Sequence, residues 1–279
     1  MNHKIVRLPF FQNILNLIAL GILALVCAFP ILHTLALSLS SSSAASSGRV
    51  TLLPVEFTLQ SYRFVLDNPA FLKSFGVSLL RVLVGVPVNM LLTILVAYPL
   101  SRTSREFRLR DAFAWFFLIT VLFSGGLIPY YMVINRTGLI DSFWALIIPG
   151  ALPVFNVVLL VNSFRNIPKE LEEAAVIEGA GPGKIFWSIV LPLAKPAIAI
   201  TALFSFMTAW NEFILAATFM NQEDMYTAPV GLKFFVGGFQ QQWGYFAAGS
   251  IIVSIPVVVL FLYLQKYLVS GLTAGSVKG

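Results

Sequence analysis

The chain has 279 residues, of which 58% are hydrophobic and only 11% are charged, and its mean hydropathy is +0.87. Soluble domains carry about 25% charged residues, so this composition excludes an ordinary soluble protein and indicates a membrane protein. The net charge of +6 comes mainly from cations that flank apolar segments, and it predicts no nucleic-acid partner. Cys27 is the single cysteine, so no disulfide can form within the chain.

Six charge-poor segments are long enough to cross a bilayer. The first has no charged residue between Leu8 and Gly48, and it is too long for a secretory signal, so we expect it to be retained as a span. Each span must be helical because lipid offers no partner for backbone N–H and C=O groups. The expected spans cover residues 14–39, 76–101, 112–134, 142–164, 196–218 and 247–267.

The distribution of Lys and Arg between the flanks predicts the orientation. If both termini are cytoplasmic, twelve cations lie inside and five outside, as the positive-inside rule favours. The inner set is Lys4, Arg7, Arg102, Arg105, Arg108, Arg110, Arg165, Lys169, Lys184, Lys195, Lys266 and Lys278, and the outer set is Arg49, Arg63, Lys73, Arg136 and Lys233. The serine-rich stretch "SLSSSSAASSG" at 38–48 then falls on the outer side, where we expect a mobile linker.

The stretch "KELEEAAVIEGAGPGKIFWSIVLP" at 169–192 is the densest charge cluster and falls on the cytoplasmic side. Pro168 and the glutamates that follow it favour a helix start, because acidic side chains complement the positive end of a helix dipole. We expect this helix to end near Gly179 in a turn that needs positive φ, and a second short helix to run from Pro182 to about Val190.

The glycines of this stretch do not form a nucleotide site. A phosphate-binding loop would need Ser or Thr where Ile185 follows Lys184, and Gly where Glu178 stands. The dinucleotide pattern fails as well, because its third glycine and the preceding strand are missing. The sequence therefore predicts no catalytic residue, no metal site and no cofactor bound by this chain.

The spacing of the same stretch resembles the EAA loop of membrane subunits of binding-protein-dependent ABC importers. The matching residues are Glu173, Ala174, Ala175, Gly179, Ile189, Leu191 and Pro192, with Glu178 where the family usually has Asp. "WNEF" at 210–213, "TAPVGL" at 227–232 and the ending "GLTAGSVKG" are similar to maltose-type sugar permeases. "SGGLIP" at 124–129 is similar to a branch associated with complex oligosaccharides.

The resemblance implies a fold, a function and partners. It implies an all-α polytopic protein with six transmembrane helices, the type I ABC importer permease fold, in one domain covering 1–279, with a coupling loop at 165–195 and a cytoplasmic tail at 268–279. The implied location is the bacterial cytoplasmic membrane. Implied partners are a second permease subunit, two ATPase subunits that use ATP and Mg, an extracytoplasmic solute-binding protein and an oligosaccharide.

The tail is implied to contact the ATPases, through Gly271, Thr273, Gly275 and Lys278. Its three glycines predict that it does not hold a stable helix by itself. A frayed terminus is the alternative.

Two sets of intramembrane residues have two interpretations each. Glu212, with Asn211, either lines a translocation path or packs against a partner by hydrogen bonds. The breaks at Gly125, Gly126 and Pro149 either line the path or are ordinary kinks.

The last outer loop carries Phe239, Gln240, Gln241 and Trp243, which we expect to contact the binding protein; aromatic anchoring at the membrane interface is the alternative. Two other functions remain open at this stage. One is an ABC permease for a non-sugar solute, and the other is an ion-coupled carrier that would use Glu212 with His33 or Arg81 as a titratable partner.

Overall fold

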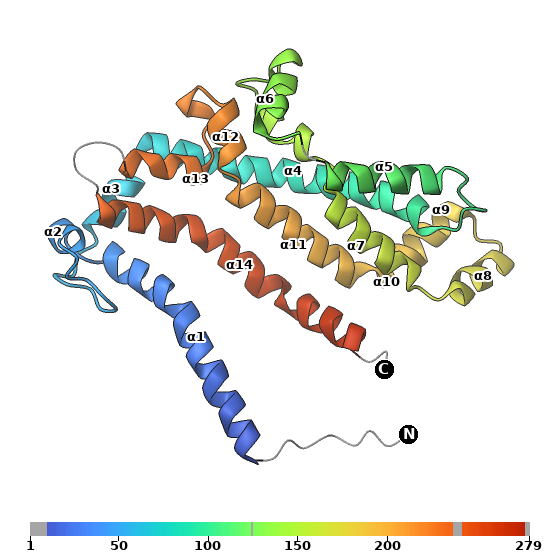
Figure 1. Cartoon of the computed structure of the whole chain (residues 1–279), viewed down its shortest axis with the longest axis horizontal. Helices are drawn as coiled ribbons and strands as arrows, with labels where there is room; N and C mark the ends of the chain where they lie inside the picture. The colour runs from blue at the N-terminus through green and yellow to red at the C-terminus, as the bar shows by residue number, and fades with distance from the viewer. Residues whose placement is uncertain (1–9, 124, 237–241, 277–279) are drawn as a thin grey trace. The chain divides into compact units, whose positions relative to one another are not determined.

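The computed structural model describes residues 10–123, 125–236 and 242–276, with side chains described as far as residue 266. Every regular element in these ranges is helical (Figure 1). The chain forms two compact units, one comprising Met1–Pro69 with Leu232–Ser254 and the other Ala70–Gly231 with Ile255–Gly279. We call them unit 1 and unit 2.

Unit 1 contains a long apolar helix and a folded outer segment. Its elements are α1 (Phe10–Ser38), α2 (Ser42–Ser46), α3 (Gln60–Leu66), the 3₁₀ turn η5 (Leu232–Phe235) and the first part of α14 (Trp243–Ser276). Large apolar side chains are exposed all around α1, the arrangement of a helix made to be surrounded by lipid or by another membrane helix. Where η5 packs on α14, a Cβ at Gly249 would lie 2.8 Å from Leu232 Cδ2, so any larger residue would require the Leu232 side chain to move.

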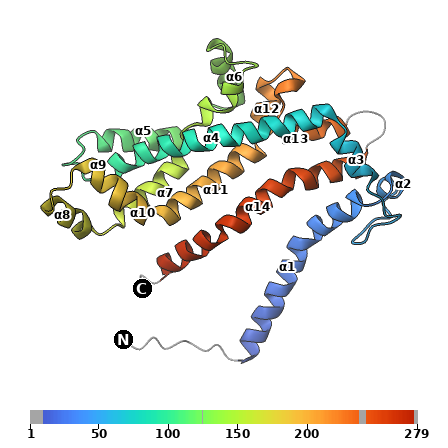
Figure 2. The same cartoon turned by 180° about the vertical axis from the view of Figure 1, so that it is seen from behind.

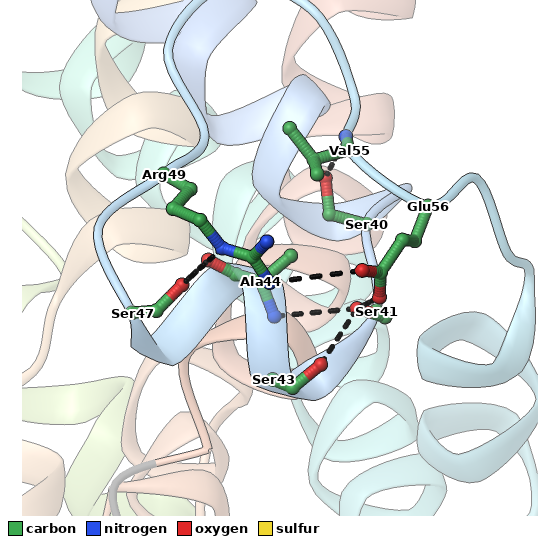
Figure 3. A network of polar contacts seen from close by, with 8 residues as sticks. All are labelled: Ser40, Ser41, Ser43, Ala44, Ser47, Arg49, Val55 and Glu56. Atoms are coloured by element: carbon green, nitrogen blue, oxygen red, sulfur yellow. Dashed lines mark hydrogen bonds and ion pairs between the residues drawn. The ribbon is translucent and has the colours of Figure 1, made fainter.

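The serine-rich segment of unit 1 is folded, which differs from the mobile linker expected from its composition (Figure 3). Ser41 caps α2 by accepting a hydrogen bond from Ala44 N at 3.2 Å, and it donates to Glu56 at 2.5 Å. Ser40, which is fully buried, accepts from Val55 N at 3.0 Å. The serine hydroxyls form hydrogen bonds with backbone groups that lack a backbone partner. A serine-rich composition, which is typical of linkers, therefore stabilises a folded loop here.

Unit 2 contains the remaining helices. They are α4 (Pro69–Ser101), α5 (Arg110–Leu122), α6 (Leu127–Arg136), η1 (Phe143–Leu146), η2 (Ile148–Gly150), α7 (Val154–Arg165), α8 (Lys169–Ile177), α9 (Pro182–Ile185), the π-helical η3 (Phe186–Val190), α10 (Leu191–Leu193), α11 (Lys195–Asn211), α12 (Ile214–Phe219), η4 (Glu223–Met225), α13 (Ala228–Gly231) and the rest of α14.

Among the described residues, three helices are long and apolar enough to cross a membrane: Phe11–Ser38, Pro69–Ser101 and Trp243–Lys266. Three bent helix pairs bring the number to six if each pair is one span; they are Arg110–Leu122 with Leu127–Arg136, Phe143–Gly150 with Val154–Arg165, and Pro182–Leu193 with Lys195–Asn211. The last two pairs bend by 45° and 74°. The breaks predicted at Gly125 and Gly126 and at Pro149 fall at or next to the first two bends.

Among the described residues of unit 2, two apolar clusters contribute to its core. One joins α4, α7, α8 and α9, with the buried side chains Ala97, Leu100, Val157, Leu160, Phe164, Ala175, Ile185, Val190 and Ala194. The other joins α6, η1, α12 and α13, with Ile134, Ala145, Leu146, Ala216, Phe219, Met220 and Val230. The first cluster fixes the predicted coupling loop to the membrane helices, and the second surrounds the helix break at Glu212.

Candidate functional site

The predicted coupling loop forms a helix, a tight turn and a second helix at one end of unit 2, beside the loop between α4 and α5 (Figures 1 and 2). Gly179 adopts φ +81°, which confirms the positive φ expected at this turn. A Cβ at Gly179 would meet no other atom within 4 Å, so backbone conformation rather than crowding requires glycine here. The second helix begins at Pro182, as the sequence predicts, and passes through a π-helical turn before α10.

The residues of the EAA pattern divide between the surface and the core. Glu173, Ala174 and Glu178 are exposed, whereas Ala175 is buried in the cluster that joins α4, α7, α8 and α9. Ile189 and Leu191 pack against that cluster, and Pro192 is exposed. A partner protein can therefore contact Ala174 directly, while Ala175 holds α8 against the chain's own membrane helices.

An ion pair ties α8 to the end of α4. Arg102 Nη1 lies 2.7 Å from Glu172 Oε2, and the guanidinium also stacks over the Tyr98 ring at 4.4 Å. Burial disfavours the charged arginine, but the hydrogen bond and the charge of Glu172 outweigh it and raise the pKa of Arg102. The sequence does not predict this pair, since no spacing rule links two charges on elements far apart in the chain.

Glu212 lies at a break between helices rather than inside one, contrary to the continuous span expected over 196–218. Its backbone is extended (φ −68°, ψ 118°) between α11 and α12. The carboxylate accepts hydrogen bonds from Leu215 N at 2.6 Å and Ala216 N at 3.0 Å, so it caps α12. A helix start in an apolar region needs such an acceptor, because its first N–H groups have no partner within the helix.

The same carboxylate pairs with a cation from another span. Arg81 Nη1 lies 3.6 Å from Glu212 Oε2, and Arg81 Nε donates to Leu146 O at 3.1 Å. The side chains are 8% and 15% exposed. A buried ion pair compensates two charges that would each be costly alone, so this pair fixes α4 to the break before α12.

The pair borders a cavity of ≈110 Å³ whose wall also includes Asn89, Tyr130 and Ser205. Ser205 donates to Asn89 Oδ1 at 2.8 Å, and Asn156 donates to Ser205 at 2.9 Å, so polar groups from three helices form one network. Such a network satisfies buried polar atoms and offers hydroxyl and amide groups to the cavity.

The other predicted path residues are placed differently. Asn211 is exposed at the end of α11. Gly125 and Gly126 border a separate hollow of ≈550 Å³ next to Tyr130, and Gly126 has φ +80° where α6 begins. Pro149, in η2, is half-buried between Ile148 and Gly150. The structure therefore does not bring these residues together with Glu212 in one cavity.

The predicted contacts at the outer loop and the tail are only partly described. Trp243 begins α14 and is 41% exposed, whereas Phe239, Gln240 and Gln241 lie outside the described residues. The backbone is helical through Gly271, Thr273 and Gly275 to Ser276, and Lys278 is outside the description. The expectation concerned a tail by itself; residues 271–276 continue α14, and a long preceding helix removes the nucleation cost that an isolated tail would face.

The family described as "binding-protein-dependent transport system inner membrane component" matches residues 66–273. The chain belongs to this family and is the permease component of an ABC transporter, not an enzyme. This assignment removes the ion-coupled carrier as an interpretation.

Relatives and a solved structure extend the match over nearly the whole chain. The chain is 36% identical to the polygalacturonan/rhamnogalacturonan transport system permease protein YtcP of Bacillus subtilis (92% of this chain, 94% of the relative) and 32% identical to the maltodextrin transport system permease protein MdxG of the same organism (100% of both). It is also similar to a chain of a bacterial ABC transporter involved in the import of the acidic polysaccharide alginate, with a TM-score of 0.85, 29% identity, and coverage of 93% of this chain and 99% of that one.

Proposed function

We propose that the chain is one of two membrane subunits of an ABC importer that takes up oligosaccharides delivered by an extracytoplasmic solute-binding protein. The observation that carries this proposal is the match, over nearly the whole chain, to permeases named for polygalacturonan, rhamnogalacturonan and maltodextrin. These names share one solute class, a chain of sugar units. A non-sugar solute is the second candidate, but no relative described above supports it.

The proposed architecture is the type I importer fold with six spans and both termini in the cytoplasm. Counting each bent helix pair as one span supports six. The excess of cations on one side supports the orientation. In this arrangement α8 and α9 lie in the cytoplasm, so only the Lys195–Asn211 part of the third bent pair belongs to the span.

The α8–Gly179–α9 elbow is the proposed coupling site. The exposed Glu173, Ala174 and Glu178 would meet an ATPase subunit, while the buried Ala175 and the pair Arg102–Glu172 transmit its movement to α4. Two separate ATPase subunits would bind and hydrolyse ATP with Mg. The helical end of α14, with Gly271, Thr273 and Gly275, is proposed as a further ATPase contact, together with Lys278, which lies outside the described residues.

Glu212 is assigned a packing role within the chain, because both of its oxygens are engaged by α12 and by Arg81. The network of Asn89, Ser205 and Asn156 is the better candidate for the path lining, since sugar hydroxyls exchange hydrogen bonds with amides and hydroxyls. On the outer side, Trp243 with Phe239, Gln240 and Gln241 is proposed to contact the binding protein.

Reconstitution tests the proposal. The chain, its partner permease, the ATPases and the binding protein are placed in liposomes, and uptake of labelled oligogalacturonides and maltodextrins is measured with and without ATP. We expect uptake of at least one of the two sugars that needs both ATP and the binding protein. Uptake by the chain alone along an ion gradient, or ATP-driven uptake restricted to a non-sugar solute, would contradict it.

A further inference from the structure

A second pocket in unit 2 lies between the ends of α4 and α7 and the start of α8, and its wall is rich in cationic side chains. Its volume is ≈420 Å³, and its lining includes Arg102, Arg110, Arg165 and Lys169. These four side chains come from the α4–α5 loop, the start of α5, the end of α7 and the first turn of α8. Segments that are far apart in the sequence thus bring positive charges together around one pocket.

Two carboxylates in the wall leave the pocket with an excess of positive charge. Four cations against Glu106 and Glu172 give a net charge of +2. Glu172 is engaged by Arg102, and Glu106 accepts hydrogen bonds from Thr103 N and Oγ1, each at 2.8 Å. Both acids already have partners, and Glu106 also attracts Lys169, so the wall keeps its excess of two positive charges.

The remaining cations are available to an anion. Lys169 makes no hydrogen bond or ion pair with any residue in the described ranges. Arg110 pairs with Asp111, which is outside the pocket lining, and its Nε–H is buried without an acceptor among the described residues. A buried donor without an acceptor costs free energy. An anionic oxygen that accepts a hydrogen bond from this Nε–H would remove that cost.

An exposed apolar stripe begins at Leu109, next to Arg110 in the sequence, and continues along α5. Leu109, Phe113 and Phe116 are 59%, 44% and 59% exposed, and their spacing of four and three residues places them on one side of the helix. Because α5 belongs to a proposed membrane span, this stripe would face the lipid acyl chains. A soluble anion has no use for such a stripe, whereas the acyl chains of a lipid do.

We propose that this pocket binds the phosphodiester headgroup of an anionic phospholipid of the inner leaflet, with its acyl chains along Leu109, Phe113 and Phe116. Basic pockets at the cytoplasmic ends of membrane helices suit such headgroups. Since Lys169 belongs to the first turn of α8, the bound lipid connects the bilayer to the elbow proposed for coupling. The inference rests on the proposed orientation but not on the identity of the sugar.

The test measures phosphatidylglycerol bound to the complete transporter in nanodiscs that also contain phosphatidylcholine, by native mass spectrometry. The double variant Arg110→Gln/Lys169→Gln should weaken this binding by about tenfold or more, because each cation near an anionic headgroup contributes about fivefold. The matched control is Arg105→Gln/Arg108→Gln, which removes two exposed cations of the same loop that do not line the pocket. The control should lose less than about twofold.

Three results would overturn the proposal. Equal losses in both double variants would show diffuse attraction to the loop. Displacement of phosphatidylglycerol by millimolar glycerol 1-phosphate would show a site for soluble phosphates. Unchanged lipid binding with loss of the ATPase subunits would show that the pocket faces a protein.

A second measurement needs no variant. Phosphatidylglycerol with a photoreactive acyl chain should label the unmodified transporter at Leu109, Phe113 or Phe116, and phosphatidylcholine with the same chain should label them far less. Labelling that is confined to other helices, or equal for the two lipids, would contradict the proposed site.

Discussion

Two ion pairs in unit 2 have the same chemistry and different consequences. Arg81–Glu212 lies among membrane helices with side chains 8% and 15% exposed, while Arg102–Glu172 lies at the end of α4 with 21% and 18% exposed. The first pair is part of a helix break, since Glu212 also caps α12. The second pair joins two separately formed elements. Removing one partner of the first pair should therefore destabilise the start of α12. Removing one partner of the second pair should weaken the contact between α8 and the end of α4.

The largest expected effect is on stability, from Glu212→Ala. This change leaves Arg81 buried without a counter-charge and α12 without its cap, so the free energy of unfolding should fall by about 3–5 kcal/mol. Glu212→Gln keeps an acceptor for the α12 N–H groups and should cost less. ATP-driven uptake should survive in Glu212→Gln and be no more pH-sensitive than before.

Thermal unfolding of the purified complex measures the stability effect. Arg81→Met combined with Glu212→Gln is the matched control, because it removes the uncompensated charge and should recover part of the loss. If Glu212→Ala changes stability by less than about 0.5 kcal/mol, as an ordinary surface change would, the pair does not support the break.

The next effect is on coupling, from Gly179→Leu. A side chain at φ +81° costs about 1–2 kcal/mol of backbone strain and would distort the exposed elbow. Gly181→Leu is the matched control, because Gly181 has φ −73° and equally open space around it. We expect sugar-stimulated ATP hydrolysis to fall in the first variant only, with normal membrane insertion in both. Equal hydrolysis in the two variants would refute a requirement for the turn.

These two sites also differ in how far the sequence predicts them. The turn at Gly179 follows from local signals, since acidic residues start the helix and Gly and Pro punctuate its end. The break at Glu212 does not, because no Gly or Pro lies near it and the break depends on Arg81 in a distant span. The sequence signal for this site is the presence of an acid, Glu212, inside an expected span. Arg81 is one of the two titratable partners that the sequence offers for it.

A third effect, smaller than these, is expected for Arg102→Gln. The pair is partly exposed, so stability should change by only about 1 kcal/mol or less. Coupling between ATP hydrolysis and uptake should decline more than stability does, because α8 loses its link to the end of α4. The charge-swapped variant Arg102→Glu/Glu172→Arg should restore part of the coupling. No recovery together with wild-type folding would mean that the link depends on the Tyr98 stack instead.

The smallest effect concerns Asp141, a half-buried residue of the short loop after α6. Asn221 donates to its carboxylate through its side chain at 3.0 Å and its backbone N at 2.5 Å, which lowers the pKa of Asp141. A lowered folded-state pKa stabilises the fold above the ordinary value of about 3.9. This contribution is lost as the pH falls from about 3.9 through the lowered pKa.

Asp141→Asn isolates this charge, because Asn also tolerates the φ of +56° found here. Unfolding measured between neutral pH and about pH 3 should show a weaker pH dependence in the variant, by an amount set by one carboxylate. An unchanged pH profile would show that the hydrogen bonds from Asn221 do not favour the charged form.

The most direct measurement of the coupling claim is a cross-link between α8 and an ATPase subunit. Cys27 is the single native cysteine and is replaced by Ser, and a cysteine is then introduced as Ala174→Cys, which is exposed on α8. Ala174→Cys should form a short cross-link to the ATPase that changes yield when ATP binds, while Ser43→Cys, on the proposed outer side, should form none. A transporter that hydrolyses ATP at the full sugar-stimulated rate without any cross-link from Ala174→Cys would contradict the account.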